Sequence, residues 1–207
     1  MKLYLSSYKL GNHPEKLAAM VGSNKKAAVI ANAMDFLENF EVRKGKVKAE
    51  VDVLKVLGFL PEEVDLRDYF GKPEELARKM SEFGLVWVRG GNAFLLLRAY
   101  IESGMDKWLI DQKDNKQLVY GGYSAGCVVL SPTMEGVDIV DDPNTLAPGY
   151  KPEIIWSGLG LIDYSFVPHF ESEHLESEAV GRVVVYLKEN NINFKAIHDG
   201  EVIISET

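Results

Sequence analysis

Short apolar runs alternate with amphipathic segments along most of the chain. Residues 27–31 and 85–88 are apolar on both faces, which is typical of buried parallel strands. Residues 43–57 have helical periodicity and stop before Gly58, and residues 73–83 begin with proline and are followed by Gly84. Further strands are predicted at 2–6, 63–66, 118–121, 159–162, 164–167, 194–197 and 202–204, and further helices at 16–21 and 93–103.

Strands that alternate with helices predict an α/β protein with a mainly parallel sheet covered on both faces. No internal repeat, low-complexity tract or linker interrupts the pattern, so a single domain over residues 1–207 is expected. Residues 135–150 contain two prolines and many acidic residues, which indicates a surface excursion around a site. In open parallel sheets, functional groups gather where strands end.

A Gly-x-Ser-x-Gly sequence spans residues 122–126, after a β-favouring run and before a segment that can open a helix. This is the setting of a nucleophile elbow, in which Ser124 lies in a sharp turn. Such a turn needs small residues two positions before and after the serine, and Gly122 and Gly126 satisfy this need. The backbone N–H of Ala125 would then point toward a developing oxyanion. The alternative is an ordinary glycine-rich turn.

Two further segments could complete a catalytic site around Ser124. Gly90 and Gly91 follow the predicted strand 85–88 and open a helix, so their N–H groups could supply a second oxyanion donor. His169 follows another predicted strand, where a general base for the serine is expected. Taken singly, the glycine pair could be a tight turn or a phosphate-binding turn, and the histidine could be structural.

Composition narrows the class of protein. The chain has 23 basic and 31 acidic residues, a net charge of −8, which argues against a nucleic-acid partner. The single cysteine, Cys127, permits no internal disulfide, and the start of the sequence lacks an export signal. A cytoplasmic protein without a membrane-spanning segment is therefore expected, with no cofactor and no metal site.

Together these segments resemble the peptidase E family, which includes aspartyl dipeptidases and cyanophycinases. The resemblance covers essentially the whole chain. It rests on residues 88–94 (Val-x-Gly-Gly-Asn-x-Phe), 122–126, Ser131-Pro132-Thr133, Pro168-His169-Phe170 and Ile197-His198-Asp199-Gly200. It implies a three-layer α/β/α fold of the flavodoxin or class I glutamine amidotransferase type. It also implies a serine peptidase acting on very short peptides, as a monomer or homodimer.

By position, the resemblance implies Ser124 as nucleophile, His169 as base, and an oxyanion hole formed by Ala125 with Gly91 and Gly90. The third catalytic residue has three candidates. Asp199 occupies the family position before the last strand and ranks first, and Asp138, in the loop after the elbow helix, ranks second. Glu171, two residues after the histidine, imitates the His-x-Glu of amidotransferases and ranks third.

The sequence indicates the substrate specificity less clearly than it indicates the catalytic residues. Aspartyl-specific family members carry an arginine after the catalytic histidine, whereas residues 171–178 here are rich in glutamate and the next arginine is Arg182. Carboxylates would repel an aspartyl side chain but could receive an α-ammonium group or a basic residue. Strict Asp-Xaa specificity is therefore not expected.

Two other functions remain open on the sequence. One is an α/β-hydrolase-type esterase in which His198 is the base and Asp138 or Asp163 the acid. The other is a non-catalytic, amidotransferase-like binding module in which Ser124 is only a turn residue.

Overall fold

The computed structural model describes all residues 1–207, and its centre is a six-stranded sheet. The strand order is β3-β2-β4-β5-β1-β8, and every neighbouring pair is parallel except β1 and β8. The strands are β1 (Lys2–Ser6), β2 (Lys26–Ile30), β3 (Leu60–Glu63), β4 (Leu85–Val88), β5 (Val119–Tyr123) and β8 (Val202–Glu206). The predicted α/β architecture with a mainly parallel sheet is confirmed.

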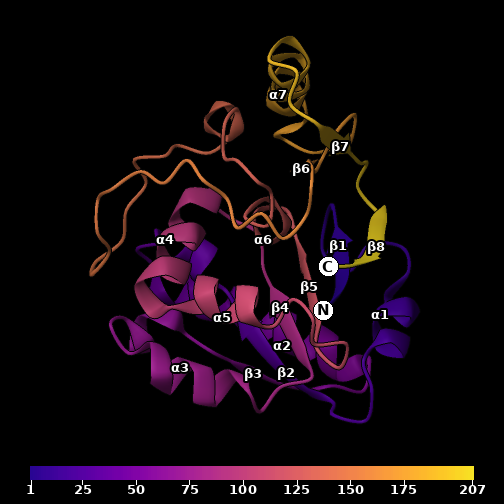
Figure 1. Cartoon of the computed structure of the whole chain (residues 1–207), viewed down its shortest axis with the longest axis vertical. Helices are drawn as coiled ribbons and strands as arrows, with labels where there is room; N and C mark the ends of the chain where they lie inside the picture. The colour runs from indigo at the N-terminus through magenta and orange to yellow at the C-terminus, as the bar shows by residue number, and fades with distance from the viewer.

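Helices cover both faces of this sheet (Figure 1). Leu3 and Leu5 of β1 face a core shared with α3 to α6, while Tyr4 faces a core shared with α1 and α2, because successive strand residues point to opposite faces. The helices are α1 (Pro14–Met20), α2 (Phe40–Val56), α3 (Pro73–Met80), α4 (Ala93–Ser103), α5 (Met105–Asp111), α6 (Ala125–Val128) and α7 (Ser177–Glu189). Short 3-10 turns are η1 (Asn32–Met34), η2 (Leu66–Tyr69) and η3 (Val137–Ile139). None of the helices combines the length and apolar character needed to cross a bilayer.

A second, two-stranded sheet lies beyond the carboxyl ends of β1 and β5 (Figure 1). Its strands β6 (Ser165–Val167) and β7 (Phe194–Ala196) are parallel. Val167 packs with Val180, Val183 and Leu187 of α7 in a core separate from the main one. Both strands therefore end near the edge of the main sheet where catalytic groups are expected.

The structure corrects several predicted elements. The strands predicted at 194–197 and 202–204 are present but are not neighbours, because β7 and β8 belong to different sheets. Residues 159–162 form no strand, and the third strand is at Leu60–Glu63 rather than 63–66. Leu161 and Ile162 instead donate their N–H groups to the carbonyl of Leu130, so this apolar segment pairs irregularly with the chain after the elbow.

Arg98 of α4 anchors the excursion predicted at 135–150. Its side chain is buried, and its guanidinium donates to the carbonyls of Glu153 (2.9 Å), Thr145 (3.1 Å), Pro143 (2.7 Å) and Pro152 (3.4 Å). Charge-assisted bonds to carbonyls are stronger than neutral ones, so a single arginine ties an otherwise irregular segment to a helix of the main layer.

Candidate active site

Ser124 lies in a sharp turn between β5 and α6, with φ +49° and ψ −122°. A non-glycine residue rarely adopts a positive φ, and such strain persists where the surrounding structure enforces it. A Cβ on Gly122 would lie 2.6 Å from the carbonyl oxygen of Val88, and one on Gly126 would lie 2.5 Å from the same atom. Only glycine therefore fits on either side of the serine.

The Gly90–Gly91 turn contacts the serine directly. A Cβ on Gly90 would lie 2.9 Å from the Cβ of Ser124, and Gly91 has φ +152° and approaches the carbonyl of Ala33. Neither glycine N–H donates a hydrogen bond within the chain. The structure therefore leaves unpaired donors beside the serine, as an oxyanion site requires.

His169 and Asp199 meet because they follow the two paired strands of the small sheet. Val167 of β6 is in register with Ala196 of β7, and the pairing continues through Ile197, whose N–H donates to the carbonyl of Val167 (3.0 Å). Nδ1 of His169 donates to Oδ1 of Asp199 at 2.7 Å, because a carboxylate can only accept. This bond leaves Nε2 of His169 as the ring nitrogen that can act as a base.

Ser7, which the sequence reasoning missed, joins this pair to the main sheet. Its Oγ donates to Oδ1 of Asp199 (2.7 Å) and accepts from the backbone N–H of His169 (2.8 Å). The N–H of Asp199 in turn donates to Oγ of Ser172 (2.8 Å). Its position in the sequence could have indicated a role in the site, because Ser7 directly follows β1, the strand beside β5.

Burial keeps His169 neutral. Desolvation lowers the pKa of its imidazole below the usual 6.5, and the hydrogen bond to Asp199 opposes this shift without overcoming it. The ring stacks on that of His174, with 3.8 Å between centroids, and meets the ring of Tyr8 edge-on at 5.9 Å. At neutral pH the imidazole is therefore an unprotonated base in a fixed orientation.

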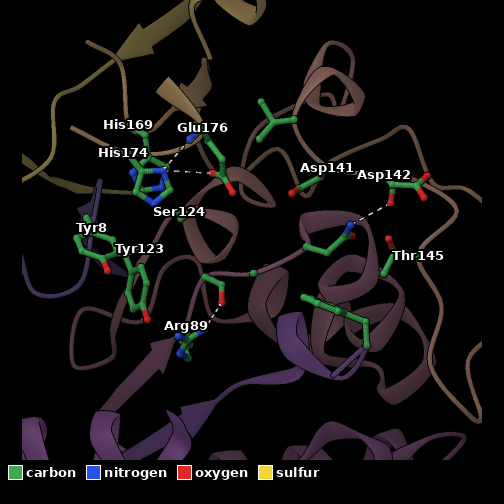
Figure 2. A pocket seen from close by; sticks show the side chains of 15 residues that line it. Tyr8, Arg89, Tyr123, Ser124, Asp141, Asp142, Thr145, His169, His174 and Glu176 are labelled. Carbon is green, nitrogen blue, oxygen red and sulfur yellow. Dashed lines mark hydrogen bonds and ion pairs between the residues drawn. The ribbon is translucent and has the colours of Figure 1, made fainter. Parts of the chain in front are cut away.

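Ser124 and His169 line one cavity of about 350 Å³ (Figure 2). Asp142 and Glu176 supply negative charge to this cavity, Asp141 adds a third carboxyl group, and Arg89 is its only lysine or arginine. The cavity walls come from the glycine turn, the excursion after the elbow helix and the segment after β6. The other lining residues are Tyr8, Phe36, Gly90, Gly91, Asn92, Tyr123, Val140, Thr145 and His174.

The charged groups of the cavity are held in different ways. Oδ2 of Asp141 accepts from the N–H of Ala93 at the start of α4 (2.7 Å), and burial raises the pKa of this carboxyl to about 7. Arg89 donates to the carbonyl of Gly90 (2.8 Å) and lies 3.3 Å from a carboxylate oxygen of Glu50. The carboxyl group of Asp141 and the guanidinium of Arg89 thus lie on different segments that line the same cavity.

Several sequence-predicted residues lie elsewhere. Asp138 is exposed on η3, and Glu171 is exposed with its carbonyl accepting from Nδ1 of His198 (3.3 Å). His198 and Asp163 are also exposed. None of these four lines the cavity that contains Ser124, so the structure does not bring together the Ser124–His198 pair that an esterase would need. Asp138 and Glu171 likewise make no hydrogen bond to His169.

One group of side chains could hold a metal ion. Ligand atoms of His169, His174 and Glu176 lie within 4.8 Å of one another, and two histidines with a glutamate form a set that suits zinc. Metal-binding histidines commonly donate their second nitrogen to a carboxylate, as His169 does to Asp199. A metal ion bound here would occupy Nε2 of His169.

Comparison with known proteins identifies the family of the chain. The model of peptidase family S51 matches residues 9–206. An uncharacterised peptidase of Listeria monocytogenes, Lmo0363, is 28% identical over 148 residues, which cover 68% of each chain. Peptidase E of Streptomyces coelicolor is 28% identical over 142 residues, which cover 66% of this chain but only 54% of that protein.

Solved structures share the fold. The crystal structure of a Listeria monocytogenes EGD-e protein superposes with a TM-score of 0.75 at 24% identity, covering 100% of this chain and 98% of that one. A peptidase from an acI-B1 Actinobacterium gives a TM-score of 0.68 at 14% identity, covering 99% of this chain and 83% of the other. With the family model matching nearly the whole sequence, the chain belongs to peptidase family S51, the peptidase E family.

Proposed function

We propose that this peptidase is a serine peptidase that hydrolyses short peptides, with Ser124 as nucleophile, His169 as base and Asp199 as the orienting acid. The observation that carries the proposal is the 2.7 Å bond between Asp199 and His169, which lines the same cavity as a serine in a strained turn. The same three roles recur on unrelated folds, where geometry identifies them.

The proposed steps give each of these groups one role. His169 takes the proton of Ser124 through Nε2 while Oγ attacks the scissile carbonyl. The N–H groups of Gly90, Gly91 and Ala125 stabilise the oxyanion. His169 then passes the proton to the leaving amine, and a water molecule repeats the sequence to release the acyl group.

Charge in the cavity favours peptides with free ends. Asp141 and Glu176 can receive the α-ammonium of an N-terminal residue, which would bring that residue's carbonyl to Ser124. Arg89 can pair with the free carboxylate of a short product or substrate. An internal segment of a folded protein offers neither group, so very short peptides suit the site best.

The proposal is tested by incubating the protein with a panel of dipeptides and with an acylating fluorophosphonate. We expect dipeptide cleavage and stoichiometric labelling, both of which are lost in Ser124→Ala. N-acetylated versions of the same dipeptides should be cleaved at least tenfold more slowly, because they lack the ammonium group. Cleavage of simple esters without cleavage of any dipeptide would contradict the proposal.

Zinc is expected to inhibit this peptidase. An ion held by His169, His174 and Glu176 would occupy the lone pair that must accept the proton of Ser124. Micromolar Zn²⁺ should lower the rate of dipeptide cleavage reversibly, and EDTA should restore it. The variant His174→Ala should need at least tenfold more zinc for half-inhibition. Activity that depends on zinc and disappears with EDTA would contradict this expectation.

A further inference from the structure

A second, smaller cavity opens beside Ser124. Its volume is about 40 Å³, and it shares Ser124, Val140, Asp141, His169 and Glu176 with the larger cavity. The groups that would hold the reacting carbonyl and the α-ammonium therefore line both cavities, and Figure 2 shows them in the larger one.

The rest of this small cavity is apolar. Its walls come from α6, η3, the end of β6 and one face of α7, and no lysine or arginine lines it. Six of the 13 lining residues are valines: Val128, Val137, Val140, Val167, Val180 and Val183. An aspartyl side chain placed here would lose its hydration without gaining a cation, and Glu176 would repel it.

Arg182, the first arginine after His169, does not change this charge balance. Its side chain is 60% exposed and lies 3.5 Å from Glu178 on the same helix. The residues of α7 that face the small cavity are Val180 and Val183. The helix thus turns its apolar face to the site and its charged face to solvent.

The position of the small cavity identifies what it can bind. The N-terminal residue of a peptide carries a carbonyl, an ammonium group and a side chain on one Cα. With the carbonyl at Ser124 and the ammonium between Asp141 and Glu176, which line both cavities, the side chain can enter the small cavity. The leaving part of the peptide then lies in the larger, polar cavity, which contains Arg89.

We infer that the small cavity binds the side chain of the substrate's N-terminal residue, and that this residue is small and apolar. The inference rests on the proposed function and deepens it. The small cavity measures about 40 Å³ against about 350 Å³ for its larger neighbour, so it suits a short side chain. Alanine offers such a side chain, whereas leucine, phenylalanine and lysine carry longer ones.

The test compares kcat/KM for dipeptides that differ only in their first residue. We expect Ala-Xaa to exceed Gly-Xaa about tenfold, which is the contribution of one methyl group in a fitted pocket, and to exceed Asp-Xaa and Lys-Xaa at least a hundredfold. Preference for aspartate or lysine in the wild type would overturn the inference while leaving the serine peptidase intact.

Two variants locate the effect in this cavity. Val183→Phe fills it, so the rate with Ala-Xaa should fall about tenfold more than the rate with Gly-Xaa. Val183→Ala enlarges it, so the rate with Leu-Xaa should rise relative to Ala-Xaa. Val185→Phe, at a half-exposed position of the same helix outside both cavities, is the matched control and should change neither ratio.

Fluorophosphonate labelling of Ser124 shows that each variant is folded and keeps its nucleophile. If neither Val183 variant changes the ratios although both are labelled, the small cavity does not bind the side chain. If no dipeptide is cleaved and the wild type is not labelled, the proposed function fails and this inference falls with it.

Discussion

Alanine at either Ser124 or His169 is expected to lower kcat by about a million-fold, and alanine at both positions is expected to lower it no further. The serine and its base act as one unit, since neither can form the acyl intermediate without the other. Pre-steady-state and steady-state rates of dipeptide cleavage by the two single variants and the double variant check this result. If the double variant lost much more of its kcat than either single variant, Ser124 and His169 would not act in the same step.

His198→Ala is the control that separates a peptidase from an esterase of the α/β-hydrolase type. His198 is exposed and lines neither cavity beside Ser124, so its loss should leave kcat within about twofold of wild type. A collapse of activity in His198→Ala, together with survival of His169→Ala, would instead make His198 the base.

Asp199→Asn is expected to lower kcat about 10⁴-fold with little change in KM. An asparagine amide can donate to Nδ1 of His169, which would favour the tautomer with its proton on Nε2 and remove the lone pair that accepts the serine proton. The effect lies in proton transfer rather than in substrate binding, so a split between kcat and KM is the diagnostic measurement.

Asp138→Asn and Glu171→Gln are matched controls for this prediction. Both carboxylates are exposed, and neither bonds to His169, so each variant should keep nearly full activity. A large loss in either variant, with an active Asp199→Asn, would reassign the orienting acid. Ser7→Ala should have an intermediate effect, because it removes one of the bonds that hold Asp199 but leaves the carboxylate.

Local pattern was enough to predict the elbow and the sheet. The strand before Ser124, the two small residues around it and the apolar runs of β2 and β4 each carry their own signal, because burial on both faces selects apolar residues throughout. Helix α7 could also have been predicted, since Val180, Val183, Val184 and Leu187 have the spacing of one helical face.

Contacts between residues far apart in the sequence could not be predicted from such local patterns. The bond between His169 and Asp199 depends on β6 pairing with β7 instead of β7 pairing with β8, and strand partners are not encoded in periodicity. The place of Ser7 depends on β1 lying beside β5, which requires the whole strand order. The small valine-lined cavity likewise forms only when α6, η3 and α7 come together.

Arg98 holds the excursion after the elbow helix through its backbone, whereas substrate recognition depends on its side chains. All four acceptors are backbone carbonyls, which every amino acid provides, so the anchor places no demand on the side chains of residues 143–153. The side chains of residues 143–153 can therefore change by mutation without loss of this anchor. Side chains that contact the substrate can therefore vary while Arg98 keeps the backbone of the excursion in place. Loss of Arg98 would remove all four of these hydrogen bonds at once.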